Sequence, residues 1–148
     1  MMNKAEEFYN GGRRALKEGM MLEALALFEK AFNIDPENPN YQSFFGFCIA
    51  YERGTIRQAI DLCEKALKTE PEMIEGYLNL GRIYLRAGLK VRAVEIFRDG
   101  LKIDNKNPEI IEELNALGLR KGVVISFFLR KNVLNKYLGI IFNRLGLR

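Results

Sequence analysis

Ten side chains in the first two-thirds of the chain have types and spacings that suit the binding of a peptide. They fall in three groups, at residues 9–17, 44–51 and 78–86. Apart from the adjacent Leu78 and Asn79, members of a group are three or four residues apart, which places them on one side of a helix. Aromatic and arginine side chains dominate the energy of protein interfaces, and arginine pairs well with carboxylates. We therefore expect a surface for a ligand with apolar anchors and acidic groups, formed by Tyr9, Arg13, Lys17, Phe44, Phe47, Tyr51, Leu78, Asn79, Arg82 and Arg86.

These ten residues also allow a second interpretation. The aromatic residues could belong to the hydrophobic core, and the basic residues could be ordinary solvated surface groups. Helical spacing alone does not separate the two interpretations, because the bounds of a helix inferred from sequence carry an error of a few residues. Both interpretations stay open at this stage.

Groups that could catalyse a reaction or bind a metal are sparse. Histidine is absent from the 148 residues, which removes histidine-based acid–base catalysis and most metal sites. Cys48 and Cys63 fall within apolar helical patterns, so we expect small buried residues. Glycine pairs at residues 11–12 and 118–122 lack the strand-to-helix setting of a phosphate-binding loop. The sequence predicts a non-enzymatic protein without a metal ion or cofactor.

The elements that position these residues are marked by small residues with a period of 34 or 35. Each copy has a glycine, then a turn glycine, an alanine five residues after the turn, and another small residue seven residues later. Helices approach closely only where facing side chains are small, so each copy predicts a hairpin whose first-helix glycine faces its second-helix alanine. The four sets are Gly12, Gly46, Gly81; Gly19, Gly54, Gly88; Ala24, Ala59, Ala93; and Ala31, Ala66, Gly100.

Start and stop signals agree with this period. Asn38 and Asn107 each precede a proline, which is typical of an N-cap followed by a first-turn proline. Thr55 and Gln58 predict a capping box. Strand signals are lacking before residue 120. The expected helices span residues 3–18, 21–34, 39–53, 56–69, 73–87, 90–103 and 108–117.

The repeating units resemble tetratricopeptide repeats, with copies at residues 5–38, 39–73 and 74–107. The resemblance implies an all-α fold, a right-handed α-solenoid of helix-turn-helix hairpins, and we expect residues 108–117 to cap it. Residues 1–118 would then form one repeat domain. The resemblance also implies a protein–protein interaction adaptor or scaffold, which captures a peptide or helix in a concave groove lined by the first helix of each unit.

Some members of that family bind the acidic C-termini of chaperones through a clamp of Lys, Asn, Asn, Lys and Arg. The matching positions in this chain hold Tyr9, Arg13, Phe44, Glu75 and Asn79. Only Asn79 has a side chain that the clamp uses elsewhere, and Glu75 would repel a carboxylate. The sequence therefore predicts a groove that is not a chaperone-tail clamp.

Residues 119–148 differ in composition from the rest of the chain. They hold seven basic residues and no acidic residue, whereas residues 1–118 hold 16 basic and 19 acidic residues. Thirteen apolar residues crowd residues 123–142, and burying each is worth roughly 1.5–3 kcal/mol. We therefore expect the apolar residues of this C-terminal extension to be buried against another surface. The expected docking residues are Phe127, Phe128, Leu134, Tyr137, Leu138 and Ile141.

Four surfaces could bury the apolar residues of the extension. It could fold back on its own solenoid, even as a plug in the groove, or bind a partner protein. It could pair with a second copy in a homo-oligomer, or lie on an anionic membrane. Nucleic acid is disfavoured as a partner, because the basic residues are dispersed among aliphatic ones. Residues 1–22 lack the pattern of a signal peptide and no apolar run is long enough to span a bilayer, so the expected location is cytoplasmic, with membrane association as the alternative.

Overall fold

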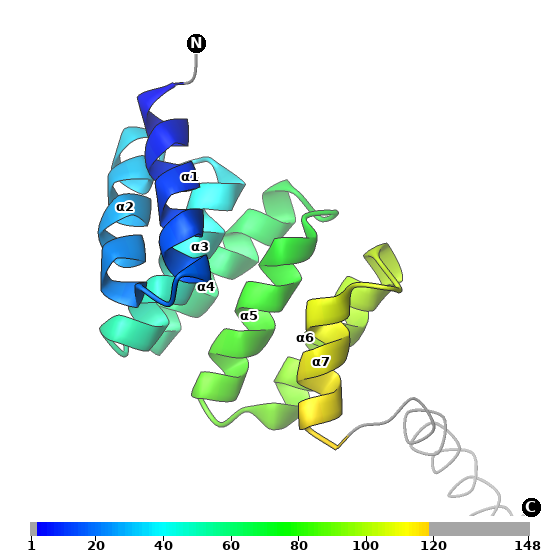
Figure 1. The fold of residues 1–148 in the computed structure, drawn as a ribbon. Coiled ribbons are helices and arrows are strands. Elements are labelled where there is room, and N and C mark those ends of the chain that lie inside the picture. Colours follow the sequence, from blue (N-terminus) through cyan, green and yellow to red (C-terminus); the bar gives the residue numbers. More distant parts are fainter. Residues whose placement is uncertain (1–2, 119–148) are drawn as a thin grey trace, which may run out of the picture. The chain divides into compact units, whose positions relative to one another are not determined.

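The computed structural model describes residues 3–118, and within them it contains seven helices and no strand. Each helix begins and ends within one residue of the bounds expected from the sequence. Figure 1 shows their order along the chain. The helices are α1 (Lys4–Lys17), α2 (Met21–Ile34), α3 (Pro39–Glu52), α4 (Ile56–Thr69), α5 (Ile74–Arg86), α6 (Lys90–Ile103) and α7 (Pro108–Ala116).

The chain divides into two compact units, Met1–Ile110 and Ile111–Arg148. The first unit holds α1 to α6 and the start of α7. Its helices pack as three hairpins, α1 with α2, α3 with α4 and α5 with α6, and successive hairpins meet where α2 packs on α3 and α4 packs on α5 (Figure 1). The first helices of the second and third hairpins, α3 and α5, are also in contact. The fold is an all-α solenoid of helical hairpins.

The turn inside each hairpin depends on a glycine backbone. Gly19, Gly54 and Gly88 have φ angles of 75°, 68° and 75°. This left-handed region costs a residue with a Cβ roughly 1–2 kcal/mol. An added Cβ would meet nothing within 4 Å at any of the three positions. The requirement for glycine here is therefore conformational and not one of space.

The helix starts confirm two of the three predicted caps. The Oδ1 of Asn38 accepts hydrogen bonds from two backbone N–H groups of α3, at 3.0 and 3.4 Å. The Oδ1 of Asn107 accepts one from the start of α7, at 3.0 Å. The predicted capping box is wrong, because the Thr55 side chain accepts no hydrogen bond from α4. Its hydroxyl instead donates to the Ile49 carbonyl oxygen at 3.4 Å, which ties the turn back to α3.

The close contact inside two of the hairpins differs from the prediction. A Cβ added to Gly12 would lie 2.7 Å from Cε1 of Phe28, and one added to Gly81 would collide with the ring of Phe97. These glycines therefore face aromatic rings, where we predicted alanines. Because glycine has no side chain, each ring packs directly against the backbone of the first helix. Both rings are fully buried. The predicted alanines are also fully buried: Ala24, Ala59 and Ala93.

In the second hairpin the glycine does face the alanine. A Cβ on Gly46 would lie 3.0 Å from the carbonyl oxygen of Ala59 and 3.2 Å from Sγ of Cys63. Cys63 occupies the position that Phe28 and Phe97 hold in the other hairpins. Because the thiol is smaller than a benzyl ring, the two helix backbones come near each other at this point.

Helix α3 lies at the centre of the solenoid, and every residue from 41 to 50 is buried. Its polar groups need partners within the protein for this reason. Gln42 donates a hydrogen bond to the Pro36 carbonyl oxygen at 2.7 Å. The Ser43 hydroxyl accepts one from the Asn79 amide at 3.0 Å, which links α3 to α5. The centre of the fold therefore combines apolar packing with specific polar contacts between hairpins.

Candidate functional site

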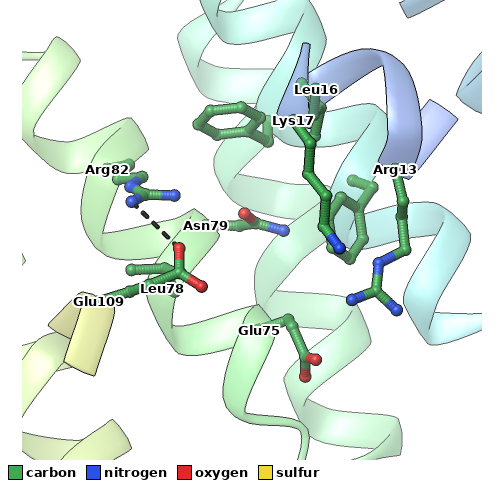
Figure 2. Close-up of a pocket in the computed structure, with 10 residues that line it drawn as sticks. Arg13, Leu16, Lys17, Glu75, Leu78, Asn79, Arg82 and Glu109 are labelled. Carbon is green, nitrogen blue, oxygen red and sulfur yellow. Dashed lines mark hydrogen bonds and ion pairs between the residues drawn. The ribbon is translucent and has the colours of Figure 1, made fainter. Parts of the chain in front are cut away.

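A cavity of about 270 Å³ lies along α1, α3 and α5, the first helices of the three hairpins (Figure 2). Whole small molecules usually occupy pockets of roughly 300–1,000 Å³. This cavity is below that range, and its size suits one or two side chains of a peptide. Seven of the ten residues predicted for the binding surface line it: Arg13, Lys17, Phe44, Phe47, Leu78, Asn79 and Arg82.

The floor of the cavity is apolar and comes from α3 and α5. Phe44 and Phe47 are 7% exposed and Leu78 is 6% exposed. These side chains therefore belong to the core and line the cavity at the same time. Asn79 is 4% exposed, and its amide donates to Ser43 within the protein. Its main role in the structure is to join the two helices.

Tyr9 does not line the cavity. Its ring is half-buried and lies 5.3 Å from the ring of Tyr41, 5.4 Å from Phe44 and 5.9 Å from Phe28, measured between ring centres. Aromatic pairs at such distances stabilise a core beyond the area that they bury. For Tyr9, the interpretation as a core residue is therefore the better one.

Tyr51 and Arg86 are also absent from the cavity lining. The Tyr51 ring lies 4.7 Å from that of Phe47, and its hydroxyl donates to the Arg82 carbonyl oxygen at 3.5 Å. The Arg86 guanidinium lies over the Tyr51 ring at 5.3 Å and donates to the Tyr51 carbonyl oxygen at 3.4 Å. Together these residues hold the C-terminal end of α3 against α5, next to the cavity.

Two basic residues of α1 form one side of the rim. The Arg13 guanidinium lies over the rings of Tyr9 and Phe44, at 5.8 and 5.9 Å from their centres. Lys17, one turn further along, is exposed. Neither side chain forms an ion pair with any carboxylate of residues 3–118. Both charges are therefore available to an acidic group of a ligand.

Two carboxylates line the cavity as well. Glu109, at the start of α7, pairs with Arg82 at 3.4 Å (Figure 2). Glu75, in the first turn of α5, has no ion-pair partner within the described part of the chain. Burial raises the pKa of Tyr9, Arg13 lowers it in part, and the charge of Glu75 raises it, so the field of this carboxylate reaches α1.

Three lining residues were missing from the predicted binding surface: Leu16, Glu75 and Glu109. Leu16 stands three residues after Arg13, so helical spacing could have found it. The sequence points to Glu75 only through its position in the chaperone-tail clamp. No sequence signal places Glu109 beside Arg82. The predicted docking residues of the extension lie outside the described residues: Phe127, Phe128, Leu134, Tyr137, Leu138 and Ile141.

The chemistry of the described residues favours binding. Cys48 and Cys63 are buried, and burial raises the pKa of both thiols to about 12, so neither is a nucleophile near neutral pH. Within residues 3–118 no group of three or more cysteines and carboxylates is placed to hold a metal ion. None of the helices in this part of the chain has the length and apolarity that crossing a bilayer requires.

Comparison with known sequences identifies the repeats. Residues 50–112 match the tetratricopeptide repeat family. The TPR repeat-containing thioredoxin TTL4 of Arabidopsis thaliana is 32% identical over 87 residues, which are 59% of this chain and 13% of that protein. The small glutamine-rich tetratricopeptide repeat-containing protein 2 of Mycosarcoma maydis is 28% identical over 114 residues, or 76% of this chain and 32% of that protein. The chain thus spans at most about a third of these relatives.

Comparison with solved structures agrees on the fold. The first TPR domain of Spaghetti (RPAP3), solved with the HSP90 peptide SRMEEVD, matches with a TM-score of 0.63 and 20% identity, over 78% of this chain and 93% of that one. A thermophilic TPR protein of Thermus thermophilus, TTC0263, matches with a TM-score of 0.66 and 17% identity, over 80% of this chain and 68% of that one. The family match over residues 50–112 and the hairpin fold of residues 3–118 together identify tetratricopeptide repeats in this chain.

Proposed function

We propose that this chain is a non-enzymatic interaction adaptor that holds a peptide or a helix of another protein in the groove along α1, α3 and α5. The observation that carries the proposal is the cavity itself, with its floor of Phe44, Phe47 and Leu78 and the unpaired Arg13 and Lys17 on its rim. An apolar floor removes the anchor of a ligand from water, and basic groups at the edge pair with its acidic residues. The peptide bound to the RPAP3 domain supports this use of the fold.

The proposed ligand differs from a chaperone C-terminus. Phe44 and Glu75 stand where a chaperone-tail clamp uses Asn and Lys, and both line the cavity. A terminal carboxylate placed between them would lose an amide donor and meet a negative charge. An apolar side chain of the ligand would instead bury apolar surface against the Phe44 ring. The groove therefore suits an apolar side chain with an acidic neighbour.

The C-terminal extension takes part in binding together with the groove. Residues 119–148 combine a charge of +7 with many apolar residues, whereas residues 1–118 carry −3. The extension acts either as a second docking element for the partner or as an intramolecular plug of the groove. If it is a plug, removing it strengthens peptide binding by the groove; if it is a docking element, removing it weakens capture of the partner.

The groove is tested with an array of short acetylated and amidated peptides that vary in charge and apolar content. The full chain should select peptides with an apolar anchor next to an acidic residue. The double variant Arg13→Glu, Lys17→Glu should lose this selection. The matched control Arg14→Glu changes a neighbouring exposed arginine outside this cavity and should keep it. Absence of selective binding by both the full chain and a chain ending at residue 118 would refute the proposed function.

A second candidate function follows from the charge of the extension. Seven basic residues and no acidic one, interspersed with apolar residues, suit a peripheral assembly factor on an anionic membrane. Each basic residue near such a surface adds about 1 kcal/mol. The full chain should then co-sediment with vesicles that contain phosphatidylserine, but not with pure phosphatidylcholine vesicles. Binding that survives removal of residues 119–148 would reject the extension as the anchor.

A further inference from the structure

The charged rim of the groove has two sides of opposite sign. Figure 2 shows Arg13 and Lys17 extending from α1, and Glu75 extending from the start of α5. All three side chains line the same cavity, yet no ion pair joins Glu75 to either basic residue. Within the described residues, therefore, no carboxylate neutralises Arg13 or Lys17, and no basic side chain neutralises Glu75. The rim offers sites for one acidic and one basic group of a bound chain.

The third basic residue of the rim is already engaged. Arg82 pairs with Glu109 at 3.4 Å, and the Arg82 side chain is only 28% exposed. An acidic ligand group at this position would have to displace the Glu109 carboxylate, and would gain only the difference between two similar ion pairs. The acidic group of a ligand is therefore better placed at Arg13 and Lys17, which need no such displacement.

We infer that the groove selects a segment in which an apolar anchor stands between an acidic residue, held by Arg13 and Lys17, and a basic residue, held by Glu75. This inference rests on the proposed function of the groove. A purely acidic ligand brings a second negative charge to Glu75, and a purely basic one brings a positive charge to α1. Only a ligand with both signs satisfies each unpaired group, because like charges brought together in a partly buried cavity repel.

Each charge of the ligand has its own side of the groove. The apolar floor of Phe44, Phe47 and Leu78 positions the anchor. The two basic residues lie on α1 and the carboxylate lies on α5, so the acidic and basic residues of the ligand reach different helices. In the bound ligand the acidic residue therefore lies on the α1 side of the anchor and the basic residue on the α5 side.

The test uses the full chain and a peptide array in which a phenylalanine anchor is flanked by every combination of Glu, Gln and Lys. All peptides are acetylated and amidated, and hits are measured by fluorescence anisotropy. Wild-type protein should prefer peptides with one Glu and one Lys over those with two Glu by about fivefold, since each partly exposed pair contributes modestly. Glu75→Lys should move the preference to two Glu. The matched control Glu72→Lys has the same charge change outside the cavity and should leave the preference unchanged.

The outcomes separate the inference from the function on which it rests. Selection of peptides with two Glu by the wild type, or a preference that Glu75→Lys leaves unchanged, overturns the inference and leaves a peptide-binding groove in place. Failure of every peptide to bind to the full chain and to a chain ending at residue 118 overturns both. Circular dichroism of each variant checks that the helices are retained.

Discussion

Replacing Gly12 by alanine tests how tightly the first hairpin is packed. The new Cβ would lie 2.7, 2.8 and 2.9 Å from three atoms of the Phe28 ring. That ring is fully buried and stacks on Phe44, with 5.1 Å between ring centres. It therefore has little room to move away. Gly11→Ala on the same helix is the matched control, because its Cβ would meet only the flexible end of Leu27, at 3.3 Å.

Two effects oppose each other in the Gly12 variant. Alanine in place of glycine inside a helix stabilises by about 0.4–1 kcal/mol where the site has room. Forcing extra volume into a packed core costs about 1–3 kcal/mol. Helix propensity is common to both variants, so the difference between them isolates the collision. We expect Gly12→Ala to have a free energy of unfolding about 1–3 kcal/mol below that of Gly11→Ala.

Urea unfolding of both variants, followed by far-ultraviolet circular dichroism, measures this difference. With a slope of about 2 kcal/mol per M, a difference of about 2 kcal/mol moves the midpoint by about 1 M. Phe28→Leu combined with Gly12→Ala should recover part of the loss, which a double-mutant cycle quantifies. A Gly12→Ala protein as stable as Gly11→Ala would refute the close contact between glycine and ring as the basis of the hairpin.

Three further predictions concern the turns, the central polar contact and the thiols. Gly88→Ala should cost about 1 kcal/mol in urea unfolding because its φ is 75°, and Gly88→Asn should cost less; equal stability of all three proteins would contradict this. Ser43→Ala removes the acceptor of the buried Asn79 amide and should cost about 1–3 kcal/mol; a neutral result would mean that the amide finds another partner. Cys48 and Cys63 should react with a thiol reagent only on unfolding, and fast labelling of the native protein would argue against their burial. Burial raises the pKa of both thiols to about 12 from the ordinary 9.0, so the stability they contribute is fully present below pH 9 and falls as the pH rises toward 12.

The helices could be located from sequence because their ends carry local signals. The asparagine caps, the first-turn prolines and the turn glycines act within one or two residues of the chain, so the bounds came within one residue. The partner of each packing glycine depends instead on how two helices cross. Gly12 and Gly81 face aromatic rings, whereas Gly46 faces an alanine where Cys63 replaces the ring. The spacing of small residues alone does not tell these two cases apart.

The cavity was only partly predictable for a similar reason. Helical spacing gives the direction of a side chain but not the depth at which its neighbours close over it. Tyr9 points from the same side of α1 as Arg13, yet it is held by three aromatic rings. Glu109 reaches Arg82 from a helix that begins 26 residues later in the sequence, and no periodic pattern links the two.

The arrangement of the groove separates stability from specificity. Its floor comes largely from α3, which is buried along most of its length, so changes at Phe44 or Phe47 should lower both stability and binding. Its unpaired rim charges, Arg13, Lys17 and Glu75, are partly or fully exposed, and substitutions at such positions usually change stability by less than about 0.5 kcal/mol. Charge reversal on the rim should therefore change which ligand binds without unfolding the protein. A rim variant that loses both binding and stability would show that these charges also support the fold.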